Sequence, residues 1–214
     1  MGPSIRIILL ALLSLALSGA ARAHPHVWVT MHTDLVYGSD GTITGVRHAW
    51  AFDDMFSAFA TQGLESKEKG KFTRDELAPL AKVNVDSLKE YGYFTYVTAD
   101  GKKVAMGDPL PGYWLDYKDS ILTLNFTLPL KKPVKSRLLK IEIYDPTIFV
   151  DFEFAKDKPV ETTGLPSGCK MDVVLPKDIT TTQSQTLGEA FFNQLSASSD
   201  FGEQFANRIL VNCP

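Results

Sequence analysis

Short segments of alternating apolar and polar residues constrain the fold of this chain more than any other feature. In residues 26–37, mainly apolar side chains occupy the odd positions from Val27 to Leu35, and mainly polar ones occupy the even positions. A period of two is typical of a strand with one buried face. Similar segments are expected to form further strands at 42–52, 93–99, 103–106, 113–117, 121–128, 137–144, 148–154 and 170–175. Many short strands separated by turns predict a mainly antiparallel, β-sandwich-like domain.

The first two strands are expected to form a hairpin, because residues 38–41 read Gly-Ser-Asp-Gly, a turn sequence. The turn leaves the register open. A turn centred just before Asp40 places Met31 opposite His48, whereas a turn centred on Asp40 itself places His32 opposite His48. A slip of one residue exchanges the two faces of the strand, so both registers remain possible from the sequence.

A helix–loop–helix insertion is expected over about residues 53–91, which makes the predicted fold class α+β. Asp53 or Asp54 can cap the first helix, because a short carboxylate accepts a hydrogen bond from a free N–H at a helix start. Residues 73–76, Thr-Arg-Asp-Glu, match a capping box for the second helix. Pro79 is expected in the first turn of that helix, where its missing N–H costs little.

The first 23 residues have the pattern of a signal peptide. An apolar run at 7–17 is followed by Ala21-Arg22-Ala23, the small-x-small pattern that signal peptidase accepts. This run crosses only about half a bilayer, and no later run approaches the ~18 apolar residues that a span requires. We therefore expect cleavage after Ala23, a single periplasmic domain over 24–214, and no stable membrane insertion after cleavage.

The net charge bears on the possible partners of the chain, and the cysteine content bears on disulfide formation. The formal net charge is −3 without a dominant basic patch, so nucleic acid is not expected as a partner. Cys169 and Cys213 are the only two cysteines, and an oxidising compartment lets them form a disulfide. Two free buried thiols are the alternative. The bridge would hold a C-terminal helical tail, in which short helices are expected at 187–195 and 201–209.

Cleavage after Ala23 makes His24 the first residue of the mature chain. Its free amine and its imidazole Nδ1 can chelate one metal ion in a six-membered ring, and His26 adds a second imidazole nearby. The amine has a pKa near ~8, so a metal can displace its proton at neutral pH. Pro25 has no N–H, which rules out the square-planar chelate through deprotonated amides. The remaining ligands therefore have to come from elsewhere in the fold.

His48 is the best additional ligand, because it lies on the strand expected to pair with that of His26. Nitrogen-rich sites of this kind bind divalent nickel, cobalt, zinc or copper. Carboxylates near strand ends or turns can complete the coordination sphere, and the candidates are Asp53, Asp145 and Asp151. Each candidate also has an ordinary alternative role, as a hydrogen-bonded surface or core residue or as part of an amphipathic strand.

The segment from Glu65 to Glu76 has the length and frame of an EF-hand calcium loop, with Gly70 at the sixth position and Glu76 at the twelfth. The third and fifth positions should carry oxygen ligands but hold Lys67 and Lys69. Two ammonium groups repel Ca²⁺, so the loop is predicted to be degenerate and not to bind calcium.

One aromatic pair is a further binding candidate. Tyr113 and Trp114, after Pro111 and Gly112, could form a platform for sugars, although packing in the core is the interpretation that the sequence favours. Nucleophile elbows, phosphate loops and dinucleotide fingerprints do not occur in the sequence. No motif therefore indicates an enzyme class.

Five segments of the sequence resemble those of a known protein family: residues 24–29 (HPHVWV), 50–53 (WAFD), 91–96 (YGYFTY), 144–146 (YDP) and the ending 204–214. Together they resemble a bacterial family of exported proteins of unknown function, over essentially the whole mature chain. Its members are usually described as the periplasmic component of an uncharacterised ABC-type transport system. Many occur beside, or fused to, permeases of the nickel/cobalt type. The resemblance implies an inner-membrane metal permease or ABC-type transporter as the partner.

Three functions are compatible with these features. The first is a periplasmic protein that captures or hands over a divalent transition metal for a membrane transporter. The second is a copper enzyme, in which an N-terminal histidine site activates O₂. The third is a metal-free structural or interaction domain whose histidines merely end a strand. The chain is too short for the two-lobed build of ordinary solute receptors, so the first function is expected to be that of an accessory or binding component.

Overall fold

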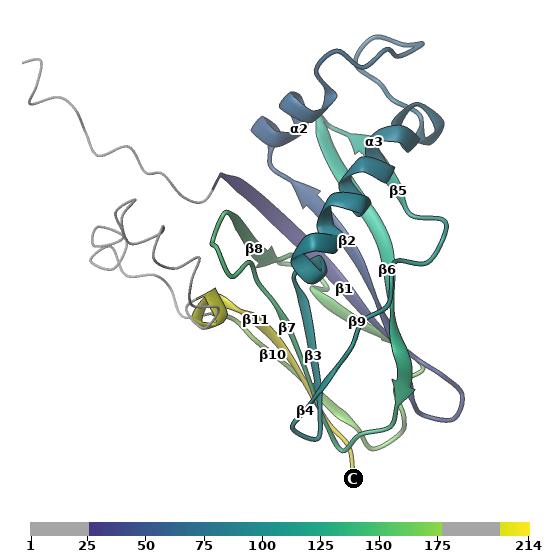
Figure 1. Cartoon of the computed structure of the whole chain (residues 1–214), viewed down its shortest axis with the longest axis vertical. Coiled ribbons are helices and arrows are strands. Elements are labelled where there is room, and N and C mark those ends of the chain that lie inside the picture. The colour runs from purple at the N-terminus through teal and green to yellow at the C-terminus, as the bar shows by residue number, and fades with distance from the viewer. Residues whose placement is uncertain (1–25, 177–201) are drawn as a thin grey trace, which may run out of the picture.

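The computed structural model describes residues 26–176 and 202–214 (Figure 1). The expected signal peptide, His24 and the helix expected at 187–195 lie outside the described residues. The described part consists of two β-sheets and two α-helices, which confirms the predicted α+β, β-sandwich-like fold. None of the helices in the described ranges has the length and apolar character needed to cross a membrane.

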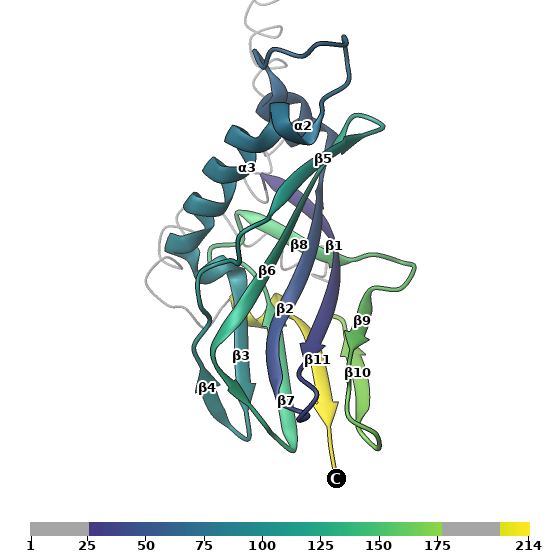
Figure 2. The same ribbon diagram turned by 90° about the vertical axis from the view of Figure 1, so that its right-hand side faces the viewer.

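The first sheet has six strands: β1 (Val27–Tyr37), β2 (Ile43–Phe52), β5 (Trp114–Lys118), β6 (Ile121–Val134), β8 (Val150–Phe154) and β9 (Val160–Thr163). They follow the order β5-β6-β2-β1-β8, and β9 pairs with β1 beyond the end of β8. The pairs of β1 with β8 and β9 are parallel, and the others are antiparallel. Figure 2 shows β1, β2 and β6 side by side on the face turned to the viewer.

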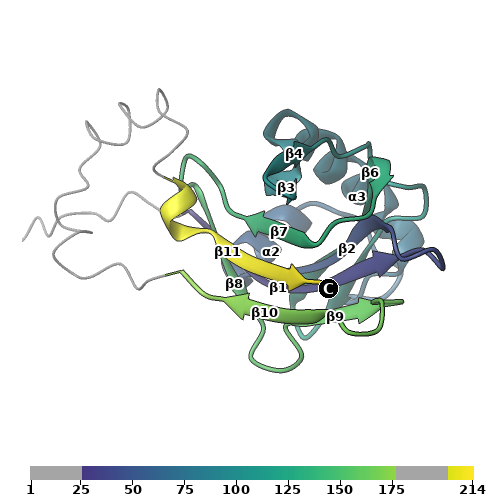
Figure 3. The same cartoon turned by 90° about the horizontal axis from the view of Figure 1, so that it is seen from below.

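The second sheet has five strands: β3 (Thr95–Ala99), β4 (Lys102–Val104), β7 (Leu138–Ile143), β10 (Lys170–Val174) and β11 (Asn207–Asn212). Their order is β10-β11-β7-β3-β4, which can be followed across the view from below in Figure 3. All of its pairs are antiparallel. The last strand of the chain therefore lies inside the sheet, between β10 and β7.

The core lies between the sheets and follows the predicted alternation. Met31 and Leu35 on β1 and Trp50 on β2 are almost fully buried, and the residues between them face outward. The ring of Trp50 meets the rings of Phe126 and Phe152 at centroid distances of 4.8 and 4.9 Å. Burial of such apolar side chains on one face of each strand is the main force that holds the two sheets together.

The register of the first hairpin differs from both predicted registers. Thr33, and neither Met31 nor His32, pairs with His48. The cause is an irregularity between Val36 and Tyr37, where the pairing shifts by one residue near the turn. A bulge of this kind adds a residue to one strand and cannot be read from the turn sequence alone.

Two helices form the expected insertion. α2 (Asp54–Thr61) is capped by Asp53, and α3 (Arg74–Leu88) begins with the predicted capping box of Thr73 and Glu76. A 3-10 helix, η1 (Lys89–Phe94), follows α3. The buried side of α3 consists of Leu77, Ala81 and Val85, and the helix lies against β5. Pro79 is the sixth residue of α3, one turn later than predicted, because the helix already starts at Arg74.

The C-terminal segment corrects one prediction and confirms another. The helix expected at 201–209 is wrong: a short 3-10 helix, η2 (Gly202–Phe205), leads into β11. Ile209 and Val211 alternate into the core, and this period of two outweighs the helical spacing of the preceding residues. The predicted disulfide between Cys169 and Cys213 is present, with Cα atoms 4.1 Å apart. It joins the end of β11 to the start of β10.

Candidate functional site

His26 lies at the start of β1, at the end of the first sheet where α2 begins. Its backbone N–H donates a hydrogen bond of 2.9 Å to the carbonyl of Phe149, the residue before β8. Its imidazole is exposed and lies over the ring of Phe149, with the ring centroids 4.8 Å apart. The neighbouring segment therefore fixes the backbone of this histidine while its ring stays at the surface.

Asp145 holds that neighbouring segment in place. Its side chain is almost fully buried and accepts hydrogen bonds from the backbone N–H groups of Thr147 (2.8 Å), Phe149 (3.1 Å) and Val150 (3.0 Å). The hydroxyl of Thr147 donates a fourth bond of 2.8 Å. A carboxylate has about four acceptor positions, and these bonds use them. The structure thus makes Asp145 the anchor of the turn beside His26, with its oxygens directed at the turn itself.

Asp151 lies on β8, on the face that it shares with His26. Trp28 pairs with Asp151 in the parallel register, and alternate residues of a strand face the same side. Asp151 is half-buried, and burial together with the nearby Glu153 raises the pKa of its carboxyl group. None of the ion pairs within residues 26–176 and 202–214 includes Asp151. A partly desolvated carboxylate therefore lies on the same face of the sheet as the exposed imidazole.

Asp53 lies on the other side of β1. One of its oxygens accepts a hydrogen bond of 2.8 Å from the N–H of Trp28, and the other accepts one of 2.7 Å from the N–H of Phe56. These bonds cap α2 and tie it to β1 at the same time. His26, Asp53 and Asp151 thus gather around the first residues of β1. The described part of the chain nevertheless contains no group of three or more His, Cys, Asp or Glu side chains placed to hold a metal ion.

His48 occupies a different place from the one predicted. It is 1 % exposed, lies between the sheets, and has its ring 5.3 Å from Trp50 and 5.2 Å from Phe126. Its strand partner Thr33 is seven residues along β1 from His26, or roughly 23 Å in an extended strand. The structure therefore does not bring His48 and His26 together, and the prediction that they share one site does not agree with this placement.

Two threonines from different sheets hold the ring of His48. Nδ1 lies 3.3 Å from the hydroxyl of Thr33, and Nε2 lies 3.2 Å from the hydroxyl of Thr95 on β3. The Thr95 hydroxyl donates its own proton to the carbonyl of Tyr93. Nε2 must therefore carry a proton and donate to Thr95, while Nδ1 accepts from Thr33. Burial lowers the pKa of His48 to about 3, which keeps the ring neutral.

The segment from Glu65 to Glu76, predicted to be a degenerate calcium loop, forms local hydrogen bonds. One oxygen of Glu76 accepts from the N–H of Lys67 (2.9 Å), and the other accepts from the N–H and the hydroxyl of Thr73 (2.8 Å each). These hydrogen bonds lower the pKa of Glu76. Gly70 has a φ of +77°, a left-handed conformation that suits the turn at the centre of the loop. Glu65 lies in the exposed segment before the turn.

A cavity of about 240 Å³ on the outer face of the first sheet was not predicted. Its lining includes Asp34, Arg47, Asn125 and Trp114. The outward face of β1 and β2 is visible in Figure 2, where none of the labelled helices lies in front of it. Two signals in the sequence pointed to an organised surface here. One was the aromatic pair Tyr113 and Trp114, the candidate sugar platform, which lies half-buried at the cavity and not in the core. The other was the opposite charge of Asp34 and Arg47, at outward positions of two strands expected to pair.

Comparison with known proteins places the chain in a family. An uncharacterised protein of Haemophilus influenzae is 22% identical over 205 residues, which cover 94% of this chain and 97% of that protein. An uncharacterised 15.5 kDa protein in the trpE 3' region of Spirochaeta aurantia is 35% identical over 92 residues, or 42% of this chain and 65% of that protein. The model of a family described as "Protein of unknown function (DUF1007)" matches residues 9–213, so the chain belongs to the DUF1007 family.

Proposed function

We propose that this chain is a periplasmic protein that binds a divalent transition metal at the start of β1. The proposed ligands are the amine and imidazole of His24, the imidazole of His26 and the carboxylate of Asp151. One observation carries the proposal: His26 directly precedes β1, Asp151 lies on the neighbouring strand β8, and the pairing of Trp28 with Asp151 puts both residues on the same face of the sheet. His48 does not belong to the ligand set.

The chemistry of these groups suits such an ion. Imidazole, amine and carboxylate together bind divalent nickel, cobalt, zinc and copper. Burial disfavours the charged form of Asp151, and a bound cation would restore it. Metal binding has to displace the protons of the amine and the imidazoles, so the affinity is expected to fall as the pH falls.

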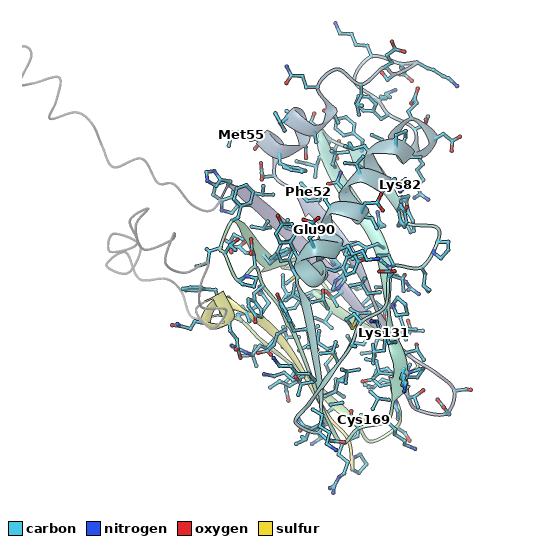
Figure 4. The ribbon with its side chains drawn as sticks, viewed as in Figure 1. Phe52, Met55, Lys82, Glu90, Lys131 and Cys169 are labelled. Carbon is cyan, nitrogen blue, oxygen red and sulfur yellow. A yellow bond between two sulfur atoms is a disulfide. The ribbon has the colours of Figure 1, made fainter. Side chains whose placement is uncertain are left out.

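The surroundings of the site support a role in handing a metal to another protein. Large apolar side chains are exposed near the start of β1: Trp28 (42 %), Phe149 (46 %), Met55 (66 %) and Phe59 (74 %). Exposed apolar groups of this size are common where a protein contacts a partner. Figure 4 shows Met55 at the end of the molecule opposite Cys169. We propose that this end contacts an inner-membrane metal permease or an ABC-type transporter.

The test is a calorimetric titration of the mature protein, produced so that its first residue is His24. Titration with Ni²⁺, Co²⁺, Zn²⁺ and Cu²⁺ is expected to give one site for at least one of these ions. His26→Ala and Asp151→Asn should each weaken it at least tenfold. His32→Ala is the matched control, because this exposed histidine lies on the same face of β1 but further along the strand. An equal loss in the control, or no binding by the wild-type protein, would contradict the proposal.

A further inference from the structure

We infer that the cavity on the outer face of the first sheet binds a neutral sugar ring. The cavity is separate from the proposed metal site: neither His26 nor Asp151 lines it. Its lining combines aromatic rings, among them that of Trp114, with a set of polar groups whose charges cancel. This combination is what a sugar requires, since one side of the ring presents C–H groups and its edge presents hydroxyls.

The cavity has its depth because a residue with a small side chain lies at its centre. One row of paired residues crosses four strands of the sheet: His32 on β1, Ala49 on β2, Asn125 on β6 and Trp114 on β5. All four face outward and line the cavity. Ala49 provides the floor of this row, and the larger side chains of the neighbouring strands rise on either side of it. A ligand can therefore rest on β2 between the two walls.

Trp114 provides a fixed aromatic wall. The Cζ atom of Arg74 lies 4.6 Å from the centroid of its ring, and its Nε1–H donates a hydrogen bond of 2.7 Å to Asp116. Arg74 also donates a hydrogen bond to Asp116 through Nε, at 2.8 Å. Arg74 does not line the cavity, so the ring face that it covers is turned away from the cavity. The ring is thus held in place, and its remaining apolar surface can stack against a ligand.

The polar groups of the cavity favour a ligand without charge. Arg47 and Asp34 form an ion pair of 2.8 Å across β2 and β1, so the charges of these two residues offset each other. Lys158 and Glu161 add one further charge of each sign to the lining. Anions and cations would each meet a repelling group of their own sign. Donors and acceptors on both walls can instead hydrogen-bond to the hydroxyl groups of a neutral sugar.

The size of the cavity limits the ligand to one ring. Its volume of about 240 Å³ lies below the ~300–1,000 Å³ that is usual for sites of drug-sized ligands. A nucleotide or an extended peptide would not fit. Tyr113 and Leu110 belong to the segment that borders the cavity beside Trp114, and Leu110 is 47 % exposed. This border is open at the surface, so a single ring can enter the cavity there.

The test is saturation-transfer NMR of the mature protein with glucose, galactose and N-acetylglucosamine at millimolar concentrations. At least one sugar should receive saturation from the wild-type protein. Ala49→Leu fills the floor without removing any polar contact and should weaken binding at least tenfold. Ala51→Leu is its matched control, because Ala51 is the next outward residue of β2 and does not line the cavity.

A second pair of variants tests the aromatic wall. Trp114→Ala should abolish the signal, whereas Trp28→Ala should retain it, since Trp28 is exposed on the same sheet but outside the cavity. Circular dichroism should show that all variants are folded. The inference is overturned if no sugar responds to the wild-type protein, or if Ala51→Leu or Trp28→Ala weakens binding as much as its counterpart.

Discussion

His26 and His48 lie on the same hairpin and occupy opposite environments. His26 stands at the start of β1 with its ring at the surface, and a turn anchored by Asp145 supports its backbone. His48 stands inside the sandwich, and both of its ring nitrogens already meet threonine hydroxyls. The comparison shows that residue type alone does not make a histidine a candidate metal ligand. Burial and existing hydrogen-bond partners determine what its ring nitrogens can bind.

The two regions also contribute differently to the molecule. The interior histidine joins the sheets, since Thr33 belongs to β1 and Thr95 belongs to β3. A buried polar network that is fully satisfied fixes a unique packing, whereas one that loses a member becomes costly. The surface histidine has an exposed ring at the start of β1. We therefore expect substitutions at the two positions to act on different properties, namely stability and binding.

The largest effect is expected for His48→Ala. The substitution leaves a cavity between the sheets and removes the partner of two buried hydroxyl groups, so the free energy of unfolding should fall by about 2–4 kcal/mol. Urea denaturation followed by circular dichroism measures this change. His32→Ala, on the exposed face of β1, is the control and should cost less than about 1 kcal/mol. Equal losses of unfolding free energy in the two variants would contradict the different roles assigned to the interior and the surface histidine.

Asp145→Asn should have the next largest effect. The amide replaces one acceptor oxygen with a donor that faces backbone N–H groups, so about 1–3 kcal/mol of unfolding free energy should be lost. Asp54→Asn is the matched control, because Asp54 is exposed and accepts one local hydrogen bond from Met55. Hydrogen exchange of the amides of Phe149 and Val150 should quicken in the first variant alone. Unchanged exchange there would show that Asp145 does not hold the turn.

The pH dependence of stability sharpens the same comparison. The folded pKa of His48 is about 3, below the value near ~6.5 of an unfolded histidine, so the unfolded chain takes up the proton first. The contribution of the neutral His48 ring to the free energy of unfolding is therefore fully present above pH ~6.5. It declines by roughly 1.4 kcal/mol per pH unit as the pH falls toward 3. His48→Gln does not titrate and should show a correspondingly shallower decline. Parallel pH profiles for the two proteins would contradict the assignment of a neutral buried ring.

The smallest effect on stability is expected for His26→Ala. The imidazole is exposed, and the hydrogen bond that positions this residue comes from its backbone, so the free energy of unfolding should change by less than about 0.5 kcal/mol. Thermal unfolding without added metal measures this change. Thermal unfolding with the bound ion should show a stabilisation in the wild-type protein that the variant lacks. A large loss without metal would mean that the residue is structural.

Local patterns in the sequence predicted much of this fold. The structure contains three features that the sequence predicted: the alternation in residues 26–37, the capping box at Thr73, and the disulfide between Cys169 and Cys213. Each of these features depends on a few neighbouring residues or on the compartment of the protein. The four-residue strand β9 was missed, because Val160–Thr163 has too short an alternation to stand out from a loop.

The candidate site was harder to predict, because it depends on register and tertiary packing. A shift between Val36 and Tyr37 moved the partner of His48 to Thr33. The parallel pairing that places Asp151 beside Trp28 joins segments more than a hundred residues apart, and no local pattern reports it. Asp145 could be recognised as a turn residue, but the number of hydrogen bonds that it accepts follows only from the folded turn.

The most direct test of the account compares the imidazole nitrogens of the histidines in one experiment. Nitrogen-15 NMR spectra of the mature protein, beginning at His24, are recorded during addition of Zn²⁺ below one equivalent. The account predicts that the resonances of His26 shift or broaden, while His48 keeps the spectrum of a neutral ring protonated at Nε2. A metal-dependent change at His48, or none at His26, would contradict it.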